Sequence, residues 1–162
     1  MNFLEGTIQR SNGDVSVLLG DQQLALDRSV LQRRPMLARY ENKEVIVGIR
    51  PESLHDAALV PVAPPGDHLH GTVELREALG PELFIHFSVP QLHAADSASI
   101  ADLPRDTGVG VQDDSGVLLI GRFPPESRVR EGGEVDAVVD AASLHFFDPD
   151  TGAGIYGAEA AA

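Results

Sequence analysis

Apolar and polar residues alternate in short runs along much of the chain, and turn-forming residues separate the runs. In the first part we expect strands at Phe3–Gln9, Val15–Leu19, Gln22–Leu26 and Glu44–Ile49. In the second part we expect strands at Gly71–Glu77, Leu83–Val89, Gly116–Phe123, Glu134–Asp140, Ser143–Phe147 and Gly154–Tyr156. Short strands at this spacing, with glycine and proline turns, are typical of a barrel or sandwich. The pattern predicts an all-β protein with little helix.

The turns between these runs have recognisable chemistry. Asn12–Gly13 is a strong signal for a tight hairpin, and Pro51 must end the strand before it. Helical periodicity is weak. The best candidates for short helices are Ser29–Arg34 and Gln91–Leu103, and the second is polar enough to be a loop.

The proline-rich stretch around Pro61–Pro65 is the natural joint between two halves. We expect residues 1–62 to form the first half and residues 69–157 the second, with the C-terminal segment free to pack back on the first half. Residues 158–162, a short alanine-rich tail, should be frayed.

The charge of the chain excludes several classes of partner. The formal net charge is −13, and Lys43 is the single lysine, so there is no basic footprint for a nucleic-acid backbone or an anionic membrane. The chain has no cysteine, which excludes disulfides and thiolate sites. No apolar run approaches the roughly 20 residues of a spanning helix, and the N-terminus carries no secretory leader, so a cytoplasmic location is expected.

Two segments about a hundred residues apart are the most informative motifs. They are Val47–Glu52 (VGIRPE) and Leu144–Gly152 (LHFFDPDTG). The order and spacing of these and several shorter motifs resemble those of one family, the C-terminal regulatory domain of the ATPase subunits of bacterial sugar-importing ABC transporters. The shorter motifs are Met1–Phe3, Gly71–Val73, Glu77–Gly80, Leu83–His86, Arg122, Pro124–Pro125 and Glu131–Gly132. The segment Gln91–Gln112 departs from that family pattern.

The resemblance implies two OB-like barrels, as found in TOBE domains, and a regulatory and dimerising role in a sugar importer. The implied partners are a second copy, the ATPase domain of the same subunit, the membrane subunits indirectly, and a regulatory protein. In the full-length subunit the transporter complex would hold the domain at the membrane. The implied interdomain or interface residues are Arg50, Pro51, Glu52, Arg122, His145, Phe146, Phe147 and Asp148.

The corner at Arg50 and Glu52 has two interpretations. Pro51 biases the preceding residues toward extended geometry and holds both charged side chains where the strand ends. A structural role, as a local ion pair or a backbone clamp that joins the barrels, is favoured. The alternative is an interdomain contact that reports the nucleotide state.

Neighbouring phenylalanines at the end of the chain should have different roles. In a strand Ser143–Phe147, Phe146 and Phe147 point to opposite faces. We expect one ring to fill a barrel core, and the other to lie under the second barrel or a dimer partner.

Other motifs carry no catalytic, cofactor or metal site. The phosphate loop Gly-x4-Gly-Lys-[Ser/Thr] is absent, so this chain alone should not hydrolyse ATP. Gly152–Gly157 matches GxGxxG, but too few residues follow it for a dinucleotide fold. The acidic turn at Asp148 has alanine at the glycine position of a calcium loop. His68 and His70 alone are too few ligands for zinc, and His86 and His145 are typical of core or interface histidines.

OB-like folds also serve two other function classes. Related OB-like domains bind molybdate or tungstate, so a free-standing oxyanion-binding protein is the alternative function, although the negative charge and single lysine count against it. An OB-type oligonucleotide binder would need basic grooves with stacking aromatics, and the chain has neither.

Overall fold

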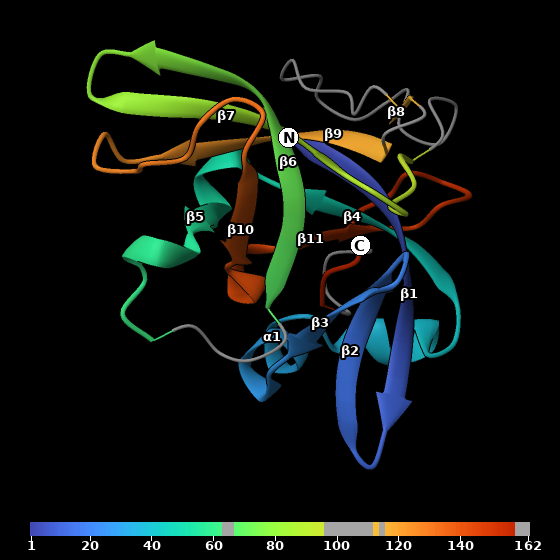
Figure 1. Cartoon of the computed structure of the whole chain (residues 1–162). Coiled ribbons are helices and arrows are strands. Elements are labelled where there is room, and N and C mark those ends of the chain that lie inside the picture. The colour runs from blue at the N-terminus through green and yellow to red at the C-terminus, as the bar shows by residue number, and fades with distance from the viewer. Residues whose placement is uncertain (63–66, 96–111, 114–115, 158–162) are drawn as a thin grey trace.

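The structure, a computed structural model, describes residues 1–62, 67–95, 112–113 and 116–157 (Figure 1). The strands are β1 (Asn2–Ser11), β2 (Asp14–Leu19), β3 (Gln22–Leu26), β4 (Glu44–Ile49), β5 (Leu54–Asp56), β6 (His68–Leu79), β7 (Glu82–Val89), β8 (Gln112–Asp113), β9 (Gly116–Phe123), β10 (Glu134–Val139) and β11 (His145–Phe147). The helix is α1 (Arg28–Arg33), and the 3₁₀ turns are η1 (Pro35–Tyr40), η2 (Pro51–Ser53), η3 (Ala57–Leu59) and η4 (Ala141–Ser143).

The strands form two antiparallel sheets. The first has five strands in the order β11-β4-β1-β2-β3, and the second has six in the order β5-β10-β6-β7-β9-β8. The all-β, OB-like fold class is confirmed. The chain crosses between the sheets twice: β5 follows the first four strands but joins the second sheet, and β11 returns to pair with β4.

Local sequence explains the hairpin and the helix start. Asn12 and Gly13 have φ angles of 52° and 89°, as a two-residue I′ turn requires, and Ser11 pairs with Asp14 across it. In Figure 1 this β1–β2 hairpin extends away from the rest of the fold. Asp27 caps α1, because its side chain accepts a hydrogen bond from the Val30 amide at 3.0 Å.

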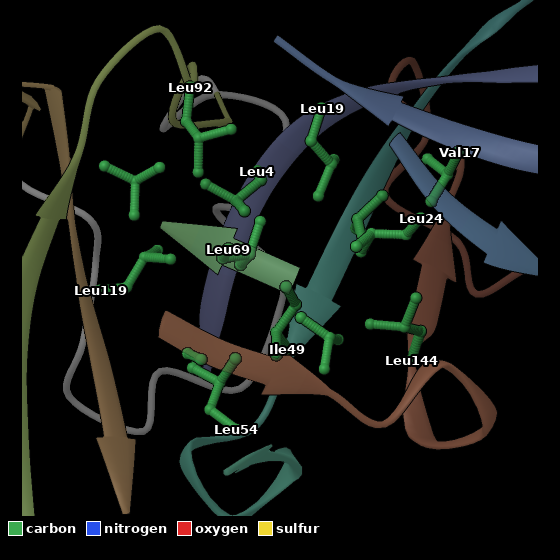
Figure 2. Close-up of a cluster of buried hydrophobic side chains, with 14 of the residues drawn as sticks. Leu4, Val17, Leu19, Leu24, Ile49, Leu54, Leu69, Leu92, Leu119 and Leu144 are labelled. Carbon is green, nitrogen blue, oxygen red and sulfur yellow. The ribbon is translucent and has the colours of Figure 1, made fainter. Parts of the chain in front are cut away.

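One hydrophobic core draws on both sheets. Leu4 and Ile8 alternate along β1 into the same buried cluster as Leu69 of β6 and Leu119 of β9. Figure 2 shows labelled leucines from both sheets, with Val17 and Ile49, gathered in this shared interior. Because the two sheets close over one core, neither sheet buries its apolar face independently of the other.

Four expectations are corrected. Gly154–Tyr156 is not a strand, because only an isolated bridge joins Phe147 to Gly154. The expected strand Ser143–Phe147 begins at His145, since Asp140 caps the 3₁₀ turn η4 before it. The strand β5 was not expected, because three residues carry too little periodicity. In the segment Gln91–Leu103, residues 91–95 contain no helix.

Other expectations fall beyond the described ranges. Residues 96–103 of that segment and the tail 158–162 lie outside them. In the part of the chain that the structure describes, no helix is both long enough and apolar enough to cross a membrane.

Candidate functional site

A hollow of about 770 Å³ is lined by residues from both sheets, and we call it the inter-sheet hollow. Its lining residues are Met1, Phe3, Arg50, Pro51, Glu52, Glu77, Leu79, Phe84, His86, Ile120, His145, Phe147 and Tyr156. Five of the eight residues that the sequence marked as interdomain residues are among them: Arg50, Pro51, Glu52, His145 and Phe147. Segments distant in sequence therefore meet at one concave surface.

Strand β11 sends its side chains to two different places. Phe146 is fully buried in the shared core, with the Arg34 guanidinium 5.8 Å from its ring centroid. Phe147 faces the other way and lies edge-on to Phe3, with 5.9 Å between ring centroids. His145 lies on the same side as Phe147 and also lines the hollow. The predicted opposite orientation of the two phenylalanines is confirmed.

The corner after β4 is held by its backbone. Arg50 accepts a hydrogen bond from the Ser53 amide at 2.9 Å, and the Ser53 carbonyl accepts one from the Asp140 amide at 2.9 Å. Among the described residues, the ion pairs do not include one between Arg50 and Glu52. Of the two structural alternatives for this corner, the ion pair is wrong. Both charged side chains are exposed at the edge of the hollow.

Asn2 joins the two sheets beside the hollow, a role that the local sequence does not reveal. Its side chain is 1% exposed. Its amide nitrogen donates to the carbonyl oxygens of Ile49 and Ile120, each at 3.0 Å, and its oxygen accepts from the Ile120 amide at 2.9 Å. The side chain thus replaces a strand-to-strand hydrogen-bond pair between β4 and β9. A lone asparagine at the start of a strand carries no signal that would predict it.

The second sheet forms the opposite wall of the hollow with the outer faces of β6, β7 and β9. Glu77 pairs with Phe84 across the hairpin, and His86 pairs with Ile120. His86 Nε2 lies 2.8 Å from Glu77 Oε2, so the histidine is tied to the wall by a carboxylate. This wall combines aromatic, aliphatic and charged side chains on one sheet face.

The rim of the hollow is apolar and accessible. Leu79 is 59% exposed and Tyr156 is 42% exposed, and both line the hollow. Leu75 is also exposed and lies on the same sheet face, because it pairs with His86. Exposed apolar groups gathered around one concave surface are typical of a contact site.

Electrostatics keep His145 neutral. Burial lowers the pKa of its imidazole, and the neighbouring positive charges of Arg50 and Arg34 lower the pKa further. A neutral imidazole can both donate and accept a hydrogen bond. The first-sheet wall of the hollow therefore carries an uncharged histidine at neutral pH.

Three of the predicted residues do not line the hollow. Phe146 is in the core, and Arg122 lies on the exposed face of β9, where its Nε is 3.5 Å from Glu82 Oε1. Asp148 caps its own turn: one carboxylate oxygen accepts from the amides of Asp150 and Thr151, each at 2.9 Å. The residues that follow Asp148 therefore form a turn held by the Asp148 side chain.

The Asp148 turn is also fastened to η1. Its second carboxylate oxygen accepts a 2.6 Å hydrogen bond from the Tyr40 hydroxyl. That bond lowers the pKa of Asp148 and raises the pKa of Tyr40 to about 12. The turn chemistry expected from the sequence is therefore present, with a tyrosine partner that local sequence did not reveal.

Among the described residues, no group of three or more histidine, cysteine or acidic side chains is placed to hold a metal ion. The hollow offers apolar contact area, one carboxylate-bound histidine and three exposed charges, Arg50, Glu52 and Glu77. This arrangement suits contact with another surface.

Family comparisons agree with the motifs. Residues 1–54 match the MalK OB fold domain, and residues 47–112 match the TOBE domain. The chain belongs to the family of OB-fold and TOBE domains of sugar-import ATP-binding subunits. The two matches overlap at residues 47–54, which include the Arg50 corner of the hollow. The TOBE match ends at residue 112, so its range includes the segment 91–112.

Curated relatives of this OB/TOBE chain are import proteins. It is 36% identical to the trehalose/maltose import ATP-binding protein MalK of Thermococcus litoralis, over 96% of this chain and 34% of the relative. It is 31% identical to the trehalose import ATP-binding protein SugC of Mycobacterium tuberculosis, over 70% of this chain and 28% of the relative. The chain spans about a third of the length of these relatives.

A solved structure shares the fold of this OB/TOBE chain. It is a cytoplasmic molybdate-binding protein, ModG, with a TM-score of 0.56 and 15% sequence identity, covering 90% of this chain and 94% of that chain. At this level of identity the similarity concerns the fold alone.

Proposed function

We propose that this chain is the regulatory and dimerisation module of the ATP-binding subunit of a sugar importer. The observation that carries the proposal is the inter-sheet hollow, where five motif residues and an exposed apolar rim form one surface. A second copy of the module is its first partner, and a two-fold axis would let the same patch serve both subunits. The ATPase domain of the same subunit, the membrane subunits indirectly and a regulatory protein are the further partners.

The two halves, residues 1–62 and 69–157, act in this proposal as one rigid platform. The exchange of β5 and β11 between the sheets supports this, as does the Asn2 bridge. A rigid platform is what a subunit contact needs if it is to persist while a motor domain opens and closes. The module would work in the cytoplasm, at the membrane through the transporter complex.

Sedimentation equilibrium tests the dimer. The parent chain should show a monomer–dimer equilibrium as concentration rises toward the millimolar range. Leu79→Glu places a charge on the rim of the hollow and should weaken association by at least about tenfold, because a desolvated charge opposes contact. Val62→Glu is the matched control: Val62 is 85% exposed, lies outside the hollow, and should have no effect.

A strictly monomeric parent chain at millimolar protein would contradict homodimerisation by this module. Equal weakening by Leu79→Glu and Val62→Glu would contradict the choice of surface. Circular dichroism of both variants establishes that each is folded before association is compared.

We also propose that this chain by itself neither binds nor hydrolyses ATP. The absence of the phosphate-loop sequence supports this. Isothermal titration with Mg-ATP should show no specific heat of binding. A micromolar dissociation constant would contradict the proposal.

The alternative is oxyanion binding, favoured by the fold shared with a molybdate-binding protein. A ligand at one hundred times its dissociation constant stabilises the folded state by about 2.7 kcal/mol. If the module is a contact platform, thermal melts with molybdate and with tungstate should superimpose on the melt with sulfate at matched ionic strength. A selective rise with molybdate would favour the alternative.

A further inference from the structure

A second hollow, of about 540 Å³, lies on the other face of β6. Its lining residues are Arg76, Ser127, Arg128, Val129, Arg130 and Glu131, and we call it the arginine hollow. Alternation along β6 turns Arg76 away from Glu77, which lines the inter-sheet hollow. The two hollows therefore use opposite faces of one strand.

The loop that supplies the other two arginines is tied to the fold at both ends. Ser127 is 4% exposed, and its hydroxyl donates to Asp56 Oδ2 at 2.6 Å. At the other end, Gly132 donates to the Val73 carbonyl at 2.8 Å, and Val73 donates to the Gly133 carbonyl at 2.9 Å. These bonds hold the loop against the bulge in β6 between Val73 and Leu75. Arg128 and Arg130 are thus presented from an anchored segment.

The three guanidinium groups have no acidic partner among the described residues. Arg76, Arg128 and Arg130 are exposed, and none of them belongs to an ion pair, in contrast to Arg10 and Arg122. Glu131 is the acid that lines the hollow, and its Oε1 already accepts from the Arg76 amide at 2.9 Å. In a chain with 25 acidic and 12 basic side chains, these three arginines without an acidic partner among the described residues line one hollow.

We propose that the arginine hollow binds the phosphate group of a small phosphorylated metabolite. Guanidinium groups are planar donors that match phosphate oxygens in pairs. The volume of the hollow lies within the range of about 300–1,000 Å³ found for small-molecule sites. This site does not depend on dimerisation, because it uses the other face of β6.

Isothermal titration at low ionic strength tests the site, with inorganic phosphate and glucose 6-phosphate as probes and chloride at matched ionic strength as the reference. We expect saturable binding of glucose 6-phosphate to one site per chain. Arg128→Gln and Arg130→Gln should each weaken it about tenfold, as loss of a charge-assisted hydrogen bond does. Arg28→Gln is the control, because it removes the same charge from an exposed position at the start of α1.

Three results of these titrations would count against the proposal in different ways. Absence of saturable binding with both probes would overturn the site. Equal weakening by Arg28→Gln would also overturn it, because the effect would then follow net charge and not geometry. Equal affinity for inorganic phosphate and glucose 6-phosphate would overturn the metabolite while retaining a phosphate site. Sedimentation of the same variants should show unchanged association, so failure of this site and failure of the dimer are distinguishable.

Discussion

The two faces of β1 and β11 carry similar side chains but have different surroundings. On one face Leu4 and Phe146 enter the core that both sheets share. On the other face Phe3 and Phe147 form a small cluster with Ile46 and Ala95, next to the inter-sheet hollow. Burial alone does not distinguish the two faces, since Phe147 is only 8% exposed. What differs is whether the neighbouring space is filled by the chain itself, so the same residue type can serve folding on one face and contact on the other.

Phe146→Ala should have the largest effect. It removes a fully buried ring from the shared core, and the free energy of unfolding should fall by about 3–5 kcal/mol. Urea denaturation followed by circular dichroism measures this. Phe84→Ala, which removes the same ring from a half-buried position on the outer face of β7, is the matched control. Equal losses for both variants would contradict the distinction between the faces.

Asn2→Ala should have the next largest effect, about 1–3 kcal/mol, because it removes the hydrogen-bond partner of the buried Ile49 carbonyl and of the partly buried Ile120 amide and carbonyl. Asn2→Asp keeps the acceptor for the Ile120 amide but buries a charge, so it should be no less destabilising. Denaturation of both variants tests the bridge. A loss below about 0.5 kcal/mol, typical of surface substitutions, would show that Asn2 does not couple the sheets.

Phe147→Ala should affect stability less than Phe146→Ala does, and it should weaken association. We expect a loss of about 1–2 kcal/mol in unfolding free energy, because the adjoining hollow lets neighbours relax into the space. Association should weaken relative to the parent chain, since Phe147 supports the floor of the proposed contact surface. Sedimentation equilibrium decides this. If Phe147→Ala associates like the parent, the hollow is not the dimer surface.

The smallest expected effect is a dependence of stability on pH. Because the pKa of His145 is lowered in the folded state, the unfolded chain binds the proton more readily between the two pKa values. Stability should therefore be full above the unfolded value of about 6.5 and fall as the pH drops below it. His145→Gln should flatten this part of the profile. Melting temperatures from pH 5 to 8 measure it, and an unchanged slope in the variant would contradict the assignment.

Local sequence predicted the strands well where periodicity is long enough. Gln22–Leu26, Glu44–Ile49 and Gly116–Phe123 coincide with β3, β4 and β9. Phe146 and Phe147 were correctly placed on opposite faces, because a strand has a period of two. The predicted start of β11 was wrong because the Asp140 side chain caps the 3₁₀ turn η4 before it. The strand β5 was missed because its three residues show too little alternation.

Part of the site was predicted and part was not. The motif residues Arg50, Pro51, Glu52, His145 and Phe147 meet at the hollow, whereas Arg122 and Asp148 do not line it. Asn2, Phe84 and Tyr156 escaped prediction because their roles depend on neighbours far along the chain. Of the two structural alternatives for the Arg50 corner, the ion pairs of the described residues do not include Arg50 with Glu52, and backbone hydrogen bonds hold the corner.

By itself the sequence determined the all-β class, the hairpin turns, the acidic charge and the absence of a phosphate loop, because these depend on local pattern and composition. The tertiary structure alone decided that β5 and β11 exchange sheets, that Asn2 stands in for a backbone hydrogen-bond pair, and that Arg76 meets Arg128 and Arg130. The physical reason is that these features arise from contacts between residues distant in sequence. Such contacts form only when two sheets close over a common core, and no short segment encodes which partner it will meet.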